Sequence, residues 1–393
     1  MTHFKYSIAR LPEIRFGAGT LAEAPERAAG FGSRVLLVTG GRSFHEGPHW
    51  QPLIDGLAEG GLEWRQTRVT DEPSPELVDG AVAEHAPWRP EVVIGIGGGS
   101  VLDAAKAIAG LLPHGNSVMD HLEGVGRGIP YTGPATPFIA VPTTAGTGSE
   151  ATKNAVLSVR GTDGFKKSFR HDELVPRLAL VDPSLLAGLP RHLMGAQGMD
   201  AFTQCLESYV SLRANPMTDA LAWSGMKAFQ EGFFKALDGD PQGHARIAHG
   251  SLMSGICLAQ TGLGSVHGLA SPLGAFFPIP HGVVCGTLVA EATEINIRAL
   301  RERAPDSPAL EKYARVGAML AGTHFHGQDV GHAQLVKILR AWQNKLELSP
   351  IGDYGMGEAD IPRVVAHCRG GSMQTNPLVL GDDELSELLR RRM

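Results

Sequence analysis

The chain contains the stretch Val92-Val93-Ile94-Gly95-Ile96-Gly97-Gly98-Gly99-Ser100, which leads directly into Val101-Leu102-Asp103-Ala104-Ala105-Lys106. Its apolar start predicts a buried strand, and the residues after Ser100 predict a helix. The turn between them carries almost no side chains, so backbone N–H groups at the start of the helix can approach an anion closely. The stretch therefore favours a seat for the pyrophosphate of a nucleotide, although glycine runs also occur in plain tight turns and helix caps.

The residues on both sides of this stretch predict an α/β fold followed by a helical one. Short β-rich runs at residues 34–39, 138–141 and 178–181 alternate with helical stretches, which is typical of a parallel sheet covered by helices. After about residue 182 the apolar residues recur at helical spacing. The longest such segments are residues 199–212, 217–237 and 244–260.

The length of the chain predicts two domains. With 393 residues it exceeds the size at which a single hydrophobic core stops growing. We expect an α/β NAD(P)-binding domain with a parallel sheet at residues 1–190 and an all-α metal and substrate domain at residues 191–393. A cleft between two such domains is a usual place for a small-molecule site.

The composition excludes several classes of partner. The chain is 43% hydrophobic and 19% charged, and its net charge of -6 leaves no basic stripe for nucleic acid. It has no run of about 18 apolar residues and no apolar signal segment at its start, so we expect a cytoplasmic protein that does not enter a membrane. The four cysteines show no CxxC spacing, which predicts reduced and mostly buried thiols. They are Cys205, Cys257, Cys285 and Cys368.

A second predicted strand also ends in a polar turn. Residues 138–141 are followed by Pro142-Thr143-Thr144-Ala145-Gly146-Thr147-Gly148-Ser149-Glu150. Hydroxyls at the carboxyl ends of parallel strands lie at the ligand crevice, where they can bond phosphate, ribose or carboxamide. A hydroxyl-rich capping turn is the plain alternative, but two such turns at the ends of two strands favour a ligand site.

The second half of the chain contains three candidate metal ligands. His267 and His281 are separated by an apolar, glycine-containing stretch, and they can converge on one metal if a helix and a loop bring them together. Asp200 lies in a predicted helix that otherwise buries apolar residues, where an unpaired carboxylate is costly and needs a partner charge or a metal. The plain alternatives are two structural histidines and an acid at the start of a helix, where the dipole favours it.

Taken in this order, these motifs resemble the iron-containing (group III) alcohol dehydrogenase family. The resemblance covers nearly the whole chain, from Phe16-Gly17-Ala18-Gly19 to Gly371-Ser372-Met373-Gln374-Thr375-Asn376-Pro377. It implies a dinucleotide-binding α/β domain and an all-helical domain, with cofactor and metal meeting in the cleft. It also implies NAD(P)-dependent interconversion of a small alcohol and an aldehyde or ketone, a divalent metal (Fe²⁺ or Zn²⁺), and a homodimer or larger homo-oligomer.

The family's functional residues can be carried over where the motifs match. The resemblance implies that Asp200, His267 and His281 bind the metal and take part in catalysis. It implies that Lys166 reaches the ribose of the cofactor. The other implied cofactor-binding residues are Gly97, Gly98, Gly99, Ser100 and Asp103 around the pyrophosphate, and Thr143, Thr144 and Thr147 along the nucleotide.

Two positions depart from the family pattern. The family's Asp-x-x-x-His motif has Gln204 in place of its histidine, one helical turn after Asp200. The amide oxygen of Gln204 can still bind a divalent ion, though less tightly than imidazole. Ser271 stands where many members carry a histidine thought to relay a proton. Because serine does not titrate near neutral pH, the proton would travel through water, the cofactor ribose or another group.

The end of the first predicted strand bears on the choice of cofactor. It reads Val38-Thr39-Gly40-Gly41-Arg42-Ser43, whereas NAD-preferring relatives often place an aspartate just after the threonine. Such an aspartate would bond the ribose hydroxyls and repel a 2′-phosphate. Here the glycines Gly40 and Gly41 leave room, and Arg42 and Ser43 can bind that phosphate. The sequence therefore favours NADPH over NADH, unless Arg42 points to solvent.

Three other functions remain open on the sequence. The first is a metal-free reductase of the same superfamily that resembles maleylacetate reductases and binds an anionic substrate with its basic and histidine groups. The second is a metal-dependent lyase that resembles dehydroquinate synthases, although the surroundings of His281 and the residues 371–377 look more like alcohol dehydrogenases. The third is a binding protein with a decayed site, against which the intact nucleotide motifs argue.

Overall fold

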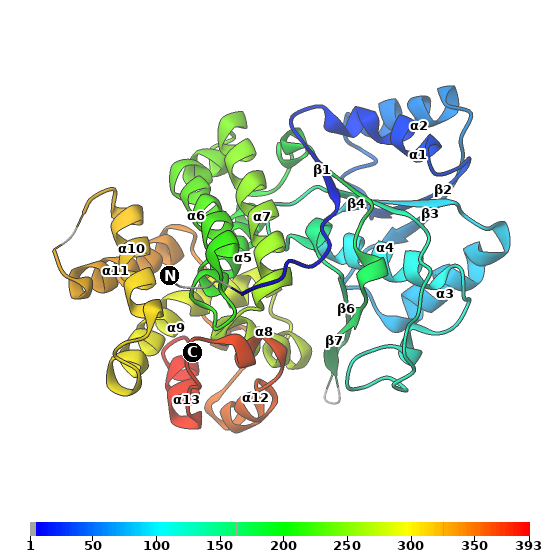
Figure 1. Cartoon of the computed structure of the whole chain (residues 1–393). Coiled ribbons are helices and arrows are strands. Elements are labelled where there is room, and N and C mark those ends of the chain that lie inside the picture. The colour runs from blue at the N-terminus through cyan, green and yellow to red at the C-terminus, as the bar shows by residue number, and fades with distance from the viewer. Residues whose placement is uncertain (1–4, 162–163, 325) are drawn as a thin grey trace.

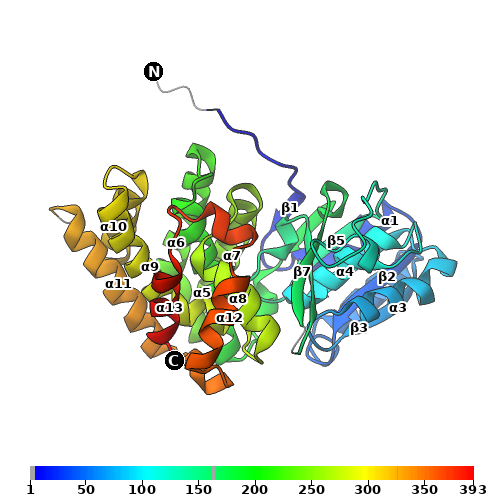
Figure 2. The same ribbon diagram turned by 90° about the horizontal axis from the view of Figure 1, so that it is seen from below.

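The computed structural model describes residues 5–161, 164–324 and 326–393 of the chain. Figure 1 shows an α/β half built from the first part of the chain beside a helical half built from the second part. Figure 2 shows the same two halves from below, again lying next to each other. In that view the extended residues before β1 (Glu13–Phe16) lead away from the sheet, and the backbone N–H of Ala9 donates to Gln260 of the helical half at 2.7 Å.

Six parallel strands form the sheet of the α/β half, in the order β1-β8-β5-β4-β2-β3. The remaining strands of this sheet are β2 (Arg34–Gly40), β3 (Glu63–Val69), β4 (Val92–Gly97), β5 (Phe138–Pro142) and β8 (Leu178–Val181). Parallel neighbours need crossover connections, which helices supply here. These helices are α1 (Ala24–Ala29), α2 (Trp50–Glu59), α3 (Pro75–His85) and α4 (Gly99–Leu111). The predicted parallel α/β fold is confirmed, and its four predicted strands are β2, β4, β5 and β8.

The central strands are apolar because both faces of the sheet are covered. Along β4, Val93 packs into the core on one face, whereas Ile94 packs into the core on the other. Every residue of β4 and of β5 is buried. This double burial explains why these strands are continuous apolar runs without a polar alternation.

A two-stranded antiparallel hairpin lies between the sheet and the helical half. Its strands are β6 (Asn154–Val159) and β7 (Phe165–Arg170), neither of which is predicted from the sequence above. Strand β6 packs against α4, and β7 packs against helix α8 (Ser265–Phe276) of the other half. The hairpin therefore joins the two halves at the edge of the space between them.

The helical half is built around α5 (Arg191–Val210), which is buried along almost its whole length. Three helices pack on it: α6 (Pro216–Leu237), α7 (Pro241–Thr261) and α9 (His281–Arg303). The predicted helical segments 199–212, 217–237 and 244–260 correspond to α5, α6 and α7. The remaining helices are α10 (Pro308–Ala321), α11 (Gln328–Lys345), α12 (Ile361–His367) and α13 (Asp382–Arg390).

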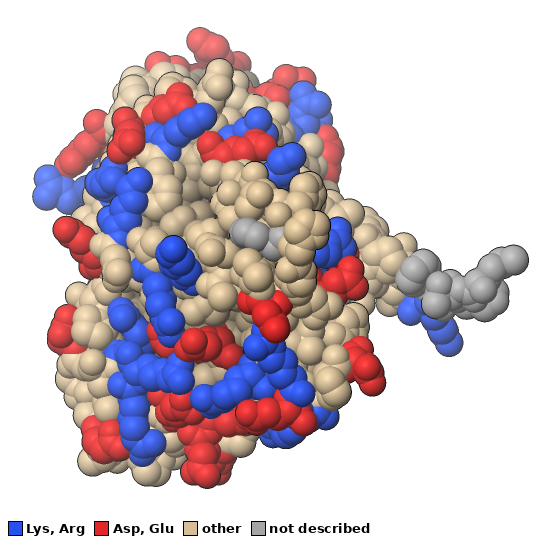
Figure 3. Space-filling view, turned by 90° about the vertical axis from the view of Figure 1, so that its left-hand side faces the viewer, with Lys and Arg blue, Asp and Glu red and all other residues tan. Residues whose placement is uncertain are grey.

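The surface and the thiols agree with the composition. Figure 3 shows lysines and arginines intermixed with aspartates and glutamates on the face that it presents. All four cysteines are buried and none forms a disulfide, as the sequence predicts. Among the helices that the structure describes, none is both long enough and apolar enough to cross a membrane.

Candidate functional site

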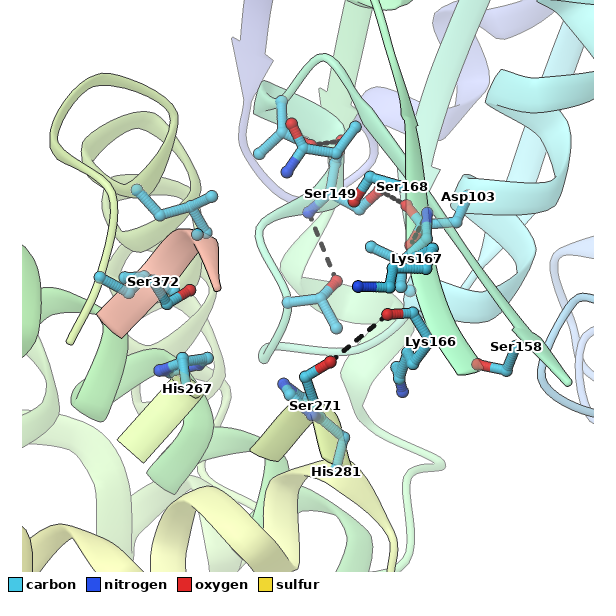
Figure 4. A pocket seen from close by; sticks show the side chains of 18 of the residues that line it. Asp103, Ser149, Ser158, Lys166, Lys167, Ser168, His267, Ser271, His281 and Ser372 are labelled. Atoms are coloured by element: carbon cyan, nitrogen blue, oxygen red, sulfur yellow. Dashed lines mark hydrogen bonds between the residues drawn. The ribbon is translucent and has the colours of Figure 1, made fainter. Parts of the chain in front are cut away.

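A cavity of about 370 Å³ lies where the two halves meet. Figure 4 shows Asp103, Ser149 and Lys166 of the α/β half on one side of it and His267 and His281 of the helical half on the other. Its volume falls in the range of small-molecule sites. Polar groups from both halves therefore converge on one cavity.

Three donor atoms from three helices meet on the helical side of the cavity. Asp200 lies in the middle of α5, His267 lies in the first turn of α8, and His281 is the first residue of α9. Nε2 of His267 lies 3.0 Å from Oδ1 of Asp200, and Nε2 of His281 lies 3.8 Å from the same oxygen. The position of Asp200 inside the helix removes the helix-start explanation for this acid, since the dipole acts within the terminal turns.

A second buried acid orients His267. Nδ1 of His267 donates to Oε2 of Glu207 at 2.6 Å, and the backbone N–H of Val266 donates to the other carboxylate oxygen at 2.7 Å. With Nδ1 held by Glu207, Nε2 of His267 is the nitrogen that faces Asp200. A carboxylate behind a histidine in this way is the usual outer support of a metal ligand.

The amide of Gln204 is engaged on both of its sides. Its Nε2 donates to Oδ1 of Asp200 at 3.1 Å, and its Oε1 accepts from the hydroxyl of Ser254 at 2.7 Å. In this orientation the amide nitrogen, which cannot bind a metal, faces the Asp200 carboxylate. The amide oxygen that the sequence analysis offered as a ligand faces Ser254 instead.

A thiol completes the cluster. Sγ of Cys285 lies 3.5 Å from Nε2 of His267 and 3.7 Å from Nε2 of His281. The donor atoms of Asp200, His267, His281 and Cys285 all lie within 4.8 Å of one another. Four potential metal ligands from three helices therefore surround one point.

The electrostatics of the cluster favour a cation. Burial penalises the Asp200 carboxylate, but the His281 and His267 imidazoles outweigh that penalty and hold its pKa below the usual value. Burial also disfavours the imidazolium of His267, yet Cys285, Glu207 and the bond to Asp200 raise its pKa well above the usual value. Burial lowers the pKa of His281 to about 4. The two buried acids Asp200 and Glu207 on either side of His267 therefore favour positive charge at this point.

The residues present fit a divalent metal. Carboxylate, imidazole and thiolate groups are the ligand types that zinc and iron sites use. Among the residues that the structure describes, Nδ1 of His281 is buried without a hydrogen-bond partner, and Nε2 lies near Sγ of Cys285 and Oδ1 of Asp200. No bond to another part of the fold therefore holds this ring for a different purpose.

The glycine turn fits an anion such as a pyrophosphate. A Cβ atom at Gly97 would lie 2.5 Å from Val101, and one at Gly99 would lie 2.5 Å from Thr147, so neither position has room for a side chain. Within the described part of the chain, no side chain caps the N-terminus of α4 at Gly98, which leaves its first-turn N–H groups available to a ligand. Such a turn at a helix start suits a phosphate.

The polar turn after β5 lies beside the glycine turn. The backbone N–H of Thr143 donates to the carbonyl of Gly97 at 2.9 Å, and the side chain of Thr144 lies against Gly98. Since β4 and β5 are paired in parallel, their carboxyl ends meet at one edge of the sheet. The two turns that the sequence singled out are therefore adjacent.

Asp103 acts largely inside the fold. Its carboxylate accepts a hydrogen bond from the hydroxyl of Ser149 at 2.6 Å and from the backbone N–H of Val156 at 3.2 Å. It also lies 3.5 Å from the ammonium of Lys106, which is fully buried and donates to the carbonyl and hydroxyl of Ser149. These bonds hold the loop that contains Ser149 against α4. Asp103 also forms part of the cavity wall.

The remaining basic candidates each have an acidic partner. The ammonium of Lys166 lies 3.0 Å from Glu72, and both residues line the cavity. Arg42 pairs with Glu46 at 2.9 Å outside the cavity, and both side chains are largely exposed. Ser271, in place of the family's second histidine, donates from its hydroxyl to the backbone carbonyl of Lys166 at 3.3 Å, as Figure 4 shows.

The predicted site residues fall into two groups in space. One group lines the cavity: Gly99, Ser100, Asp103, Thr147, Lys166, Asp200, Gln204, His267 and His281. The other group lies at the carboxyl ends of β2, β4 and β5, outside that lining: Gly40, Gly41, Arg42, Ser43, Gly97, Gly98, Thr143 and Thr144. The second group continues along the edge of the sheet from the glycine turn toward β2.

Sequence reasoning did not assign Glu207 and Cys285 to the site. Cys285 lies one helical turn after His281, and Glu207 lies two turns after Asp200. Residues with these spacings share one face of a helix, so the signal was present in the sequence. It was weak because the same spacing also describes ordinary core positions, and Cys285 was expected to be a plain buried thiol.

Two family models match the chain. The first, described as iron-containing alcohol dehydrogenase, matches residues 12–183. The second, described as the C-terminal part of the Fe-containing alcohol dehydrogenase family, matches residues 195–393. Together they cover most of both halves of the fold.

Individual relatives are also alcohol dehydrogenases. The chain is 41% identical over 283 residues to Long-chain-alcohol dehydrogenase 1 of Geobacillus thermodenitrificans, which spans 70% of each chain. It is 26% identical over 390 residues to the NADPH-dependent butanol dehydrogenase of Clostridium saccharobutylicum, which spans 96% of this chain and 95% of the relative. The second match extends over both halves.

Solved structures match along the full length. An archaeal halo-thermophilic alcohol dehydrogenase from a Red Sea brine pool superposes with a TM-score of 0.91 at 26% identity, and each chain is covered completely. A 1,3-propanediol oxidoreductase superposes with a TM-score of 0.89 at 25% identity and covers 99% of this chain and 100% of its own. Both structures therefore superpose on the two halves of this chain together.

Proposed function

The chain belongs to the iron-containing alcohol dehydrogenase family, and from this premise we propose that its cavity positions a nicotinamide cofactor against an alcohol or aldehyde beside a divalent metal. The protein is an oxidoreductase that acts on CH–OH groups. One observation carries the proposal: the donor atoms of Asp200, His267 and His281 converge on the cavity opposite the glycine turn. The metal-free alternative is not favoured, because both matching family models are those of iron-containing alcohol dehydrogenases.

The residues of the two halves have different tasks in this proposal. When bound, the metal supplies a Lewis acid that polarises the substrate oxygen, and the cofactor donates or accepts the hydride. Asp200, His267 and His281 hold the ion on the helical side. The turns that contain Gly99 and Thr147 hold the cofactor on the sheet side. The walls between them fix the distance across which hydride moves and limit the entry of water.

The proton of the alcohol needs a route other than a histidine at position 271. Ser271 lines the cavity, but its hydroxyl donates to the carbonyl of Lys166 and does not titrate near neutral pH. We therefore assign proton transfer to water or to a ribose hydroxyl of the cofactor near Lys166. Ser271 then leaves space in the cavity where a bulkier imidazole would stand.

NADPH is the proposed cofactor. Arg42 lies at the carboxyl end of β2, and its exposed guanidinium can turn from Glu46 to a 2′-phosphate. Gly40 and Gly41 offer no carboxylate that would repel this group. The butanol dehydrogenase relative, whose name gives it as NADPH-dependent, is consistent with this choice.

The substrate is proposed to be a small alcohol or its aldehyde. The relatives named above act on butanol and on long-chain alcohols. The cavity wall combines polar groups with the apolar side chains of Leu258 and Leu263, which suits a molecule with one polar end and an aliphatic remainder. The homodimer or larger homo-oligomer implied by the family resemblance stays a prediction.

The test combines metal analysis with turnover. Protein purified without added metal is analysed for iron and zinc, and NADPH and NADH oxidation is followed on a panel of aldehydes before and after chelation. We expect about one metal ion per chain and loss of turnover on its removal. His281→Ala should lose both the metal and turnover. The control Arg191→Ala, which removes an exposed ion pair with Asp238, should keep both. Full turnover after complete metal removal would overturn the proposal in favour of the metal-free reductase.

A further inference from the structure

We infer that the thiolate of Cys285, and not the amide of Gln204, is the fourth protein ligand of the metal. The inference rests on the proposed function, because it concerns the same ion. Family resemblance places the fourth ligand at position 204 and says nothing of position 285. The assignment therefore comes from the geometry of this chain alone.

Four distances within the cluster lie near those expected around a tetrahedral ion. With metal–nitrogen and metal–oxygen bonds of about 2.0–2.2 Å and a metal–sulfur bond of about 2.3 Å, neighbouring ligand atoms lie about 3.4 Å apart for nitrogen and oxygen, and about 3.6 Å apart for sulfur and nitrogen. Sγ of Cys285 lies 3.5 Å and 3.7 Å from Nε2 of His267 and His281. The two nitrogens lie 3.0 Å and 3.8 Å from Oδ1 of Asp200. All four atoms lie within 4.8 Å of one another, so they surround a space of the size that one ion needs.

The position of Cys285 in the fold suits this role. It follows His281 by one helical turn on α9, so both side chains project from the same face of one rigid element. Cys285 is fully buried and does not line the cavity, whereas Asp200, His267 and His281 do. The thiol therefore approaches the ion from the protein interior and leaves the side that faces the cavity for the substrate.

Gln204 is arranged to support the ligands rather than to join them. Its amide nitrogen donates to Asp200 and its amide oxygen accepts from Ser254. Binding the ion through oxygen would require the amide to rotate and break both bonds. In the orientation observed, Gln204 holds the carboxylate of Asp200 from the cavity side, as outer hydrogen-bond donors do at metal sites.

The thiolate predicts which metal the site selects. A soft sulfur ligand together with imidazole and carboxylate in a tetrahedral arrangement favours zinc over Fe²⁺. Zinc with four protein ligands can accept a fifth during reaction, so the substrate oxygen still has a place. We therefore expect this chain to retain zinc in preference to iron when both are offered in equal amounts.

Spectroscopy of the loaded full-length protein tests the inference independently of turnover. Zinc X-ray absorption of the wild type should show one sulfur scatterer at about 2.3 Å. The cobalt-substituted wild type should show a thiolate-to-cobalt charge-transfer band in the near ultraviolet. Cys285→Ser should lose the band and bind zinc at least about tenfold more weakly. The matched control Cys257→Ser, another fully buried cysteine that is bonded to the carbonyl of Thr218, should keep both.

The amide is tested in the same way. Gln204→Ala should keep the sulfur scatterer and the cobalt band, since Gln204 is not a ligand of the ion. A wild-type zinc site without sulfur overturns the inference while leaving the proposed function intact, provided that one ion is bound and aldehydes are reduced. A wild-type protein that binds no metal overturns both. Because X-ray absorption is measured on the wild type, it tests for the Cys285 ligand even if Cys285→Ser does not fold.

Discussion

Nδ1 of His267 and Oε2 of Glu207 are joined by a hydrogen bond of 2.6 Å between two buried side chains on different helices. The first turn of α8 lies beside the last turn of α5, and this bond, together with the one from the backbone of Val266, links the two helices at the proposed metal site. The bond decides which nitrogen of His267 faces Asp200. In the proposed metal site, Glu207 therefore acts through the ring that it orients.

Replacing Glu207 should weaken metal binding without removing a ligand. Glu207→Gln keeps the shape of the side chain, but it can offer only one acceptor oxygen to two donors, His267 and the backbone N–H of Val266. We expect metal affinity to fall about 10- to 100-fold. Competition with a chelator measures the affinity directly. Glu291→Gln, a buried acid in an ion network with Arg340, is the control and should leave the affinity unchanged.

The outcome separates positioning from simple packing. If Glu207→Gln binds metal as tightly as the wild type, Glu207 does not position His267. If Glu207→Gln and Glu291→Gln weaken metal binding equally, the effect comes from general loss of stability. We expect metal affinity to fall in Glu207→Gln but not in Glu291→Gln. The two variants should unfold at the same urea concentration.

The glycine turn should tolerate no side chain at Gly99. The added Cβ of Gly99→Ala would lie 2.5 Å from the Cγ2 and 2.8 Å from the Oγ1 of Thr147, so the threonine must move out of its place in the cavity wall. We expect the cofactor to bind at least about tenfold more weakly, as measured by calorimetric titration, because both the N–H approach and the threonine are displaced. The metal content should stay the same, since the turn lies on the other side of the cavity.

A second glycine provides the control for the first. Gly80 lies inside α3, and a Cβ built there meets no atom within 4 Å. Gly80→Ala should therefore raise the free energy of unfolding by about 0.5–1 kcal/mol through helix propensity and leave cofactor binding unchanged. Equal cofactor affinity in Gly99→Ala and the wild type would contradict the assignment of the turn.

The fold could be predicted from the sequence where the chain is buried on both faces. Strands β2, β4, β5 and β8 are continuous apolar runs, so their composition identifies them. Strand β3 is not predicted, because it reads Glu-Trp-Arg-Gln-Thr-Arg-Val and lies at the edge of the sheet, where most of its side chains are exposed to water. The hairpin of β6 and β7 escaped because neither strand carries a strong alternation and their pairing depends on contacts with α4 and α8.

The site could be predicted only in part, for a related reason. Asp200, His267 and His281 are chemically unusual for the apolar segments that contain them, so they stand out in the sequence. Cys285 and Glu207 do not, since a cysteine in an apolar helix and an acid near a helix end are ordinary. Their roles depend on how α5, α8 and α9 pack, which no local pattern states. The orientation of the Gln204 amide likewise depends on Ser254, which lies on a different helix.

The cofactor preference should depend on Arg42. Arg42→Ala should raise the KM for NADPH about tenfold, equivalent to about 1.4 kcal/mol, because a charge-assisted bond to the 2′-phosphate is lost. The KM for NADH should not change, since that cofactor has no such phosphate. Arg15→Ala, which removes another exposed arginine paired with an acid, is the control. An equal effect of Arg42→Ala on both cofactors would contradict the preference for NADPH.

The partner of Arg42 offers the opposite change. Glu46 holds the guanidinium at 2.9 Å and adds negative charge beside the proposed phosphate position. Glu46→Gln should therefore lower the KM for NADPH and leave that for NADH unchanged. If Glu46→Gln instead weakens NADPH binding, the pair acts as a unit that positions Arg42, and the arginine does not turn to the phosphate.

The last prediction concerns acid stability at the C-terminal helix. The side-chain hydrogen bond from Arg298, together with Arg391, outweighs burial and lowers the pKa of Glu387 to about 2. Its usual pKa of 4.5 applies in the unfolded chain, so the stabilising effect is complete above about pH 4.5 and is lost as the pH falls toward about 2. Glu387→Gln should thus be less stable than the wild type at neutral pH, by at most about 1 kcal/mol because the pair is partly exposed.

Urea unfolding of both proteins at about pH 7 and about pH 3 measures this difference. The gap in unfolding free energy should narrow at the lower pH, because Glu387 of the unfolded wild type takes up a proton there while the folded protein still holds the carboxylate. Asp238→Asn, which removes a more exposed ion pair with Arg191, should show a smaller gap at neutral pH. A gap for Glu387→Gln that stays constant between the two pH values would mean that the contact between α9 and α13 depends on the shape of this side chain and not on its charge.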